Sequence, residues 1–156
     1  MTDITLDAAP GDAEEAIAVM HAAFAQYSAG HPSGALLETA ASLRSEMREG
    51  QGLAVVRRDG RMVAVAKHRV AGDRVYFGRL GVLPSSRGLG LASALVRALR
   101  AHALDLGLSG LECSVRADEP GNIALYEHLG MRVVRSEERA SLTGRMTPVV
   151  VMRDPG

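Results

Sequence analysis

The sequence predicts an α/β protein of the α+β type, built on one mixed, mostly antiparallel sheet of six to seven strands with about four helices on both faces. Two observations predict this fold class. Strand-like segments at 53–57, 61–70 and 74–82 follow one another through short turns, which is typical of an antiparallel meander. A long periodic helix at 90–106 then leads to a further strand, and a strand–helix–strand crossover adds parallel pairing.

The first third of the chain predicts one strand and two helices. Residues 4–6 alternate as a strand does, and Pro10-Gly11 then breaks the pattern. Asp12 is the expected N-cap of the first helix, and Glu15 completes an Asp-x-x-Glu capping box. The apolar face of this helix comprises Ile17, Met20, Phe24 and Tyr27. A second helical face runs over residues 36–47.

The rest of the chain supplies the remaining elements. Asp59-Gly60 is a strong turn pair for a β-hairpin. A strand is expected at 108–115, a short helix at 122–129, and strands at 131–135 and 148–152. The predicted order is therefore β-α-α-β-β-β-α-β-α-β-β.

Composition favours an ordinary globular protein of one domain spanning residues 1–156. Apolar residues make up 47 % of the chain, enough for a sizeable core, and the formal net charge is zero, so nothing indicates a nucleic-acid partner. No segment approaches the ~20 apolar residues that span a bilayer, and the amino terminus lacks the apolar region of a signal peptide. We therefore expect a cytoplasmic protein without a membrane partner.

Metal and cysteine chemistry are not indicated. The five histidines lack the paired spacing of a metal site, so we expect no metal. Cys113 is the single cysteine, which excludes a disulfide within the chain. It lies in an alternating apolar stretch and is expected to be a buried core residue rather than a nucleophile.

The segment between the third meander strand and the long helix carries the clearest chemical signal. Two glycines let main-chain N–H groups turn toward one point, and a helix N-terminus adds partial positive charge, so the segment is suited to bind phosphate. Its residues are Arg87, Gly88, Leu89, Gly90, Leu91 and Ala92. The alternative is that these glycines are ordinary turn residues.

Two other phosphate-loop interpretations fit less well. A Walker loop needs Lys after its last glycine, where this chain has Leu91. The dinucleotide fingerprint is approximated with Ser93 in place of the third glycine, but four residues separate the strand from Gly88 and the loop follows an antiparallel meander. A nicotinamide site is therefore not expected.

These residues carry a family resemblance. Arg87-x-x-Gly90-x-Ala92 is similar to the Gln/Arg-x-x-Gly-x-Gly/Ala signature of the GCN5-related N-acetyltransferase (GNAT) superfamily. Residues 80–84 resemble the end of that family's cofactor-binding strand, and residues 122–131 resemble its second conserved segment. The element order extends the resemblance over essentially the whole chain.

The resemblance implies acetyl-CoA as acyl donor and gives a role to each matching residue. Main-chain groups of Leu80, Gly81 and Val82 pair with the pantetheine amides, and the N–H groups of residues 87–92 hold the pyrophosphate. Asn122 contacts the pantetheine arm, and Tyr126 lies near the sulfur as the proton donor to the leaving thiolate. The alternative for Tyr126 is an amphipathic core tyrosine.

The sequence does not identify the general base or the residues of the acceptor site. Many relatives carry a glutamate on the strand before the phosphate loop, and this chain has none there. Glu38, His68 and Glu112 are candidates, as is a water relay. Family members wall the acceptor site with their first two helices, where Phe24, Tyr27, His31 and Glu38 would lie; Phe24 and Tyr27 are better explained as core residues.

The resulting prediction is an N-acetyltransferase that acts directly on a primary amine of a small molecule or peptide. The alternative is a non-catalytic acyl-CoA-binding sensor or regulatory module, which the missing strand glutamate keeps open. A possible homodimer follows from the resemblance alone.

Overall fold

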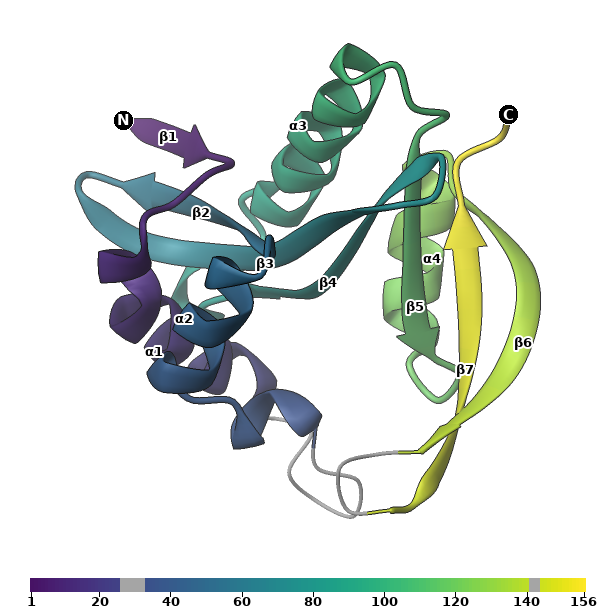
Figure 1. Ribbon diagram of the computed structural model, residues 1–156, viewed down its shortest axis with the longest axis horizontal. Coiled ribbons are helices and arrows are strands. Elements are labelled where there is room, and N and C mark those ends of the chain that lie inside the picture. Colours follow the sequence, from purple (N-terminus) through teal and green to yellow (C-terminus); the bar gives the residue numbers. More distant parts are fainter. Residues whose placement is uncertain (26–32, 141–143) are drawn as a thin grey trace. The chain divides into compact units, whose positions relative to one another are not determined.

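The computed structural model describes residues 1–25, 33–140 and 144–156. Within these ranges the chain forms seven strands and four α-helices in the predicted order (Figure 1). The elements are β1 (Thr2–Thr5), α1 (Ala13–Phe24), α2 (Ala40–Arg48), β2 (Gly52–Arg58), β3 (Arg61–Ala71), β4 (Arg74–Val82), α3 (Leu91–Asp105), β5 (Leu111–Arg116), α4 (Pro120–His128), β6 (Arg132–Ala140) and β7 (Met146–Arg153). Short 3-10 helices are η1 (Pro10–Asp12), η3 (Gly34–Leu37) and η4 (Pro84–Ser86).

Hydrogen bonding orders the seven strands as β1-β2-β3-β4-β5-β7-β6. The pairs β1–β2, β2–β3, β5–β7 and β6–β7 are antiparallel, and β4–β5 is parallel. The sheet is therefore mixed and mostly antiparallel, which confirms the predicted fold class. The parallel register joins Val75 to Leu111 and Tyr76 to Glu112.

The chain divides into two compact units, which we describe separately. Unit 1 comprises residues 1–69 and 78–98, and unit 2 comprises residues 70–77 and 99–156. Each boundary falls inside a regular element, namely β3, β4 or α3, and not in a linker. That residues 1–156 form one domain stays a prediction.

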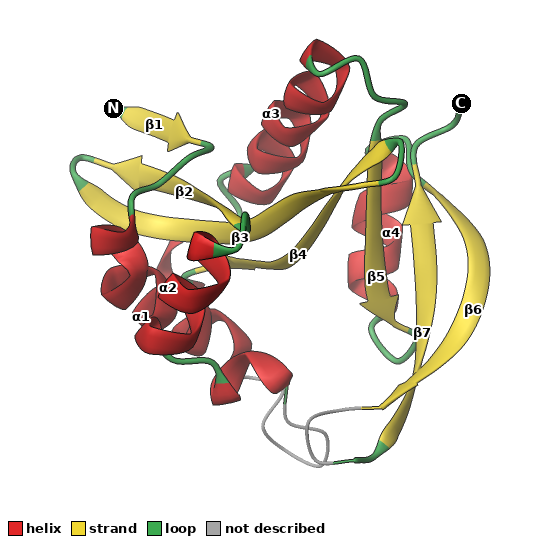
Figure 2. Ribbon diagram, in the orientation of Figure 1, coloured by secondary structure: helices red, strands yellow, loops and turns green. Residues whose placement is uncertain are grey.

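Unit 1 packs α1 and α2 close to the β2–β3 hairpin (Figure 2). Consecutive residues of β2 (53–56) and of β3 (62–66) are buried, so both faces of the sheet are covered at these positions. The hairpin turns through Asp59 and Gly60 with φ of 52° and 84°. Positive φ at both central residues is the geometry that favours Asp-Gly, so this prediction is confirmed.

The predicted capping box of α1 is wrong. Asp12 is the N-cap residue, but its side chain makes no cap hydrogen bond in α1. Its carboxylate instead accepts the Ala9 N–H at 3.1 Å and pairs with Arg57 at 3.0 Å. Glu15 also pairs with Arg57, at 3.0 Å. Arg57, which follows Glu15 by 42 residues and Asp12 by 45, thus pairs with both acids, which a local motif cannot anticipate.

The second predicted helix is divided into two pieces. Residues 34–37 form η3, and α2 begins only after Thr39. Thr39 and Ser42 build a reciprocal capping box, in which the Ser42 N–H donates to Thr39 Oγ1 and the Thr39 N–H donates to Ser42 Oγ. Glu38 lies between the two pieces in extended conformation. The helical spacing of apolar residues continues across this break, so the periodicity of the sequence did not predict it.

Unit 2 is held together at Asp154, which is buried. Its carboxylate accepts from Arg100 at 2.7 and 3.0 Å and from the Leu111 N–H at 2.9 Å, while its carbonyl accepts from buried Arg74 at 2.8 Å. A Cβ on Gly110 would lie 2.7 Å from Asp154 Oδ2, so this position requires glycine. Strand β5 starts at Leu111, later than predicted, because the Leu108 N–H donates to Ala103 O at the end of α3 and the Ser109 N–H donates to Asp73 O.

We expect Asp154→Ala to lower the free energy of unfolding by about 3 kcal/mol, because Arg100 and the Leu111 amide lose a buried acceptor. Urea titration of both proteins measures the difference. Asp118→Ala is the matched control, because Asp118 is half exposed and pairs with Arg116 near the surface; its cost should stay below about 1 kcal/mol. Equal losses in the two variants would contradict the assignment of Asp154.

Candidate active site

The segment between β4 and α3 lies in unit 1 and adopts the conformation that its glycines permit. Gly88 and Gly90 have φ of 80° and 75°, a region that other residues rarely occupy. Nothing lies within 4 Å of a Cβ built on either glycine. The exposed stretch therefore comprises residues 87–90, and Leu91 begins the helix as a buried residue.

Most main-chain N–H groups at the start of α3 have no acceptor among the residues that the structure describes. Arg87 N–H donates to Pro84 O at 3.5 Å, and Ala94 N–H closes the first helical turn on Gly90 O at 3.0 Å. Between them, within the described ranges, the amides of residues 88–93 have no protein acceptor. These are the donors that a helix N-terminus leaves unpaired, and they carry partial positive charge. The segment is thus equipped to receive an anion.

The loop is anchored to the end of α1. Arg87 Nη2 donates to Ala23 O at 3.0 Å, in the last turn of α1, where carbonyls lack helical partners. The buried Gly81 of β4 packs on the same turn, since a Cβ there would lie 2.7 Å from Ala23 Cβ and 3.0 Å from Phe24 Cε2. Gly81 is therefore required by packing. A direct phosphate contact by Arg87 stays a prediction.

The predicted roles of Leu80, Gly81 and Val82 depend on their main-chain groups. All three lie at the end of β4, beyond the Val75–Leu111 and Tyr76–Glu112 register with β5. The next residue, Leu83, donates its N–H to Val63 O of β3 at 2.8 Å. This end of β4 is thus fixed to β3, and its role toward pantetheine is a prediction.

Tyr126 and Asn122 lie in unit 2, on α4. Tyr126 is 7 % exposed, and its ring meets Phe77 of β4 edge to face, with centroids 5.6 Å apart. Asn122 Nδ2 donates to Glu119 Oε2 at 2.8 Å. Asn122 and Tyr126 are four residues apart and so lie on one face of the helix. The ring contact explains the burial of Tyr126, and its catalytic role stays a prediction.

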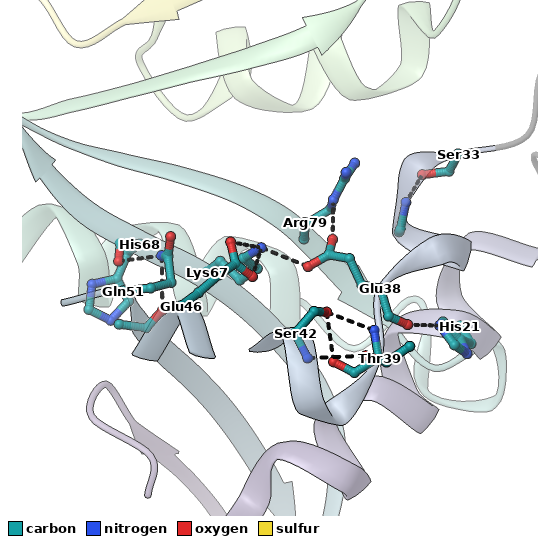
Figure 3. Close-up of polar contacts among 12 residues, drawn as sticks. His21, Ser33, Glu38, Thr39, Ser42, Glu46, Gln51, Lys67, His68 and Arg79 are labelled. Atoms are coloured by element: carbon teal, nitrogen blue, oxygen red, sulfur yellow. Dashed lines mark hydrogen bonds and ion pairs between the residues drawn. The ribbon is translucent and has the colours of Figure 1, made fainter. Parts of the chain in front are cut away.

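The three candidate bases are each engaged by the protein. Glu38 accepts from Lys67 Nζ at 2.7 Å through Oε1 and from Arg79 Nε at 2.6 Å through Oε2 (Figure 3). The buried His68 places Nε2 2.7 Å from Leu6 O, an acceptor, so this nitrogen is a donor. Glu112 Oε1 accepts from Arg153 at 2.7 Å. None of the three contacts favours a role as proton acceptor.

Other predicted residues divide between the core and the undescribed part of the chain. Cys113 is 2 % exposed, and burial raises the pKa of its thiol to about 12, so the prediction of a core cysteine is confirmed. Phe24 packs on Gly81. Tyr27 and His31 lie outside the described residues.

Two charged residues, Glu119 and Arg79, were not predicted from the sequence. Glu119 directly precedes Pro120 at the start of α4. An acidic residue at a helix start is a feature that the sequence itself shows. Arg79 has φ of 52° inside β4, and no sequence pattern indicates this. Among the described residues, no helix has the length and apolarity needed to cross a membrane, and no three potential metal ligands come together.

Burial raises the pKa of Glu119, more than its hydrogen bond from Asn122 and the charge of Arg116 lower it. A raised pKa means that the folded protein binds this proton more tightly than the unfolded chain does. Glu119 therefore favours folding at acidic pH, and this contribution is lost as the pH rises through the folded pKa.

We expect Glu119→Gln to raise the melting temperature at pH 7, because the ionised carboxylate is replaced by a neutral side chain that still accepts from Asn122. Below about pH 4, where the carboxyl is protonated in both states, the gain should vanish. Thermal unfolding of both proteins from pH 4 to 8 measures this, and a variant that is less stable at pH 7 would contradict it.

Comparison with known proteins identifies the family to which this fold belongs. The model of the acetyltransferase (GNAT) family matches residues 16–131. No curated protein matches the chain significantly. Among solved structures, a ribosomal-protein alanine N-acetyltransferase from Escherichia coli is 24 % identical with a TM-score of 0.79, over 99 % of this chain and 94 % of that one.

Two further structures share the fold. A ribosomal-protein-alanine N-acetyltransferase from Brucella melitensis is 18 % identical, with a TM-score of 0.73 over 97 % of this chain and 98 % of that one. A spermidine N-acetyltransferase chimera from Vibrio cholerae and hSSAT is 16 % identical, with a TM-score of 0.74 over 97 % and 94 %. Because the family model matches most of its length, the chain belongs to the GNAT family and is an acyl-CoA-dependent N-acyltransferase.

Proposed function

We propose that this enzyme transfers an acetyl group from acetyl-CoA directly to a primary amine of a small molecule or a peptide. The observation that carries the proposal is the set of unpaired main-chain N–H groups of residues 88–93, aimed by two left-handed glycines at the start of α3. A diphosphate satisfies such donors and gains from the partial positive charge of the helix N-terminus.

The acetyl donor would be held mainly by main-chain groups. Residues 87–92 bind the pyrophosphate, and Leu80, Gly81 and Val82 pair with the pantetheine amides as an added strand would. Asn122 binds the same arm. Since its Nδ2 already donates to Glu119, Asn122 Oδ1 is the atom left to accept a pantetheine N–H.

Acetyl-CoA supplies an activated thioester, and the chain supplies position and protons. The amine nitrogen attacks the thioester carbonyl carbon and loses a proton to solvent water, the C–S bond breaks, and the sulfur takes a proton. Tyr126 is the donor that we assign, because a phenol is protonated at neutral pH. The N–H of Val82 or of a neighbour stabilises the negative charge that develops on the carbonyl oxygen.

The names of two proteins with a similar fold support the proposed class of acceptor. Alanine of a ribosomal protein and spermidine both present amines, and one belongs to a polypeptide while the other is a small molecule. The chain resembles these proteins in fold, and the two named substrates share a reactive amine. The rival function, an acyl-CoA sensor without turnover, would bind acetyl-CoA and release no thiol with any amine.

We expect Gly90→Glu to abolish acetyl-CoA binding, because it places a carboxylate and added bulk beside the donors of the phosphate loop. Wild-type protein should gain about 2.7 kcal/mol of stability at 100 times the dissociation constant, measured as a thermal shift, and the variant should gain none. Gly72→Glu is the control, since Gly72 has φ of 61° and equally open surroundings in the turn after β3. An unchanged shift in Gly90→Glu would refute the loop assignment.

We expect Tyr126→Phe to bind acetyl-CoA normally and to lower kcat on the order of 10²-fold, because the ring contact with Phe77 is kept while the proton donor is lost. Thiol release with a panel of amines measures kcat. Tyr76→Phe removes a hydroxyl from a half-buried tyrosine of β4 and serves as the control. Unchanged turnover in Tyr126→Phe would leave Tyr126 a core residue.

A further inference from the structure

Arg79 has a backbone conformation that its position does not explain. Among the described non-glycine residues, only Asp59 and Arg79 have positive φ, both 52°. Asp59 is in a hairpin turn that requires this value, whereas Arg79 lies inside β4, three residues before its end. Strain of this kind persists only where the surroundings enforce it, and it is concentrated at functional sites. Arg79 also directly precedes Leu80, Gly81 and Val82.

The side chain of Arg79 is fixed by a buried carboxylate. Arg79 Nε donates to Glu38 Oε2 at 2.6 Å, and Glu38 is only 10 % exposed. Lys67 holds the other oxygen of Glu38 at 2.7 Å and is itself held by Glu46 at 2.9 Å. Glu38 thus cannot swing away without leaving Lys67. The guanidinium is therefore oriented before any ligand arrives, which lowers the entropic cost of binding.

The outer edge of the guanidinium remains open. Within the described ranges, Nη1 and Nη2 have no acceptor, and the side chain is 35 % exposed. A Cβ on Gly34 would lie 2.9 Å from Nη2, so the start of η3 approaches this edge with bare backbone. In Figure 3 the end of the Arg79 side chain points away from Glu38 and Lys67. The Nη1–Nη2 pair is a planar donor fork that matches a carboxylate.

We propose that Arg79 is a specificity-determining residue that binds a carboxylate of the acceptor through Nη1 and Nη2. The inference rests on the proposed function and narrows its acceptor to amines that carry a carboxylate, such as amino acids. Polycationic amines have no carboxylate for Nη1 and Nη2 to bind and would bring positive charge close to the guanidinium, so they would be disfavoured. Glu38 acts here as the positioning residue for Arg79 and not as the base.

The test compares L-amino acids with their matching amides as acceptors, with acetyl-CoA as donor and thiol release as readout. Wild-type enzyme should prefer the acid over the amide on the order of 10- to 100-fold in kcat/KM. In Arg79→Gln the ratio should fall to about one, because the acid loses the donor fork and the amide does not use it. Arg79→Lys keeps the charge but loses the planar fork, so most of the preference should be lost there as well.

Arg61→Gln is the matched control, because it removes the same charge from an exposed residue of unit 1. It should leave the ratio unchanged. A wild-type preference for amides or polyamines, or a ratio that survives Arg79→Gln, would overturn the inference and leave the proposed function intact. Acetyl-CoA binding without turnover of any amine would overturn the proposed function, and this inference with it.

Discussion

Unpaired main-chain donors at the start of α3 are the constraint around which the neighbouring part of the chain is arranged. A helix N-terminus always leaves such donors, and burying them without a partner is costly. Here they stay exposed, because Gly88 and Gly90 turn the chain through left-handed conformations just before the helix. Arg87 does not fold back onto them but is tied to Ala23 O. This contact fixes the residue that directly precedes the exposed donors.

Buried carboxylates organise each compact unit in a similar way. In unit 1, Glu38 joins the segment between η3 and α2 to strands β3 and β4 through Lys67 and Arg79. In unit 2, Asp154 joins the end of β7 to α3 and to the start of β5. A buried carboxylate with charged donors on both oxygens is held in one geometry, because losing either donor leaves charge without a partner. The strained backbone of Arg79 can persist under such a restraint.

The fold was predictable because its signals are local. In the candidate site, only the backbone conformation of the loop before α3 was predictable. The Asp59-Gly60 turn, the long helix before Gly107 and the alternating strand with Cys113 each depend on neighbours in sequence. The capping box at Asp12 was wrong because Arg57, distant in the chain, draws the acid away. Gly88 and Gly90 both have positive φ, a conformation that few other residues adopt, so the turn before α3 was predictable. Phosphate binding by this segment stays a prediction.

Side-chain partners were not predictable, because they depend on which strands the sheet brings together. Arg79 illustrates this: its contact with Glu38 joins β4 to a segment 41 residues earlier, and its positive φ has no signal in the sequence. The proposed acceptor fork therefore has no counterpart in any sequence motif. The burial of Glu119 likewise depends on packing around the turn between β5 and α4. The sequence shows only that an acidic residue precedes Pro120.

The engagement of the candidate bases bears on how the acceptor amine loses its proton. Glu38 has both oxygens occupied by cations, Glu112 is held by Arg153, and His68 is buried with Nε2 directed at Leu6 O. An amine must be neutral to attack, yet its proton need not pass to a side chain, since water near an exposed acceptor can take it. A carboxylate on the acceptor would serve this route, because binding through Arg79 fixes the substrate by a group that does not titrate near neutral pH. The missing strand glutamate is then compatible with the proposed function, in which the chain orients the acceptor and its proton passes to solvent.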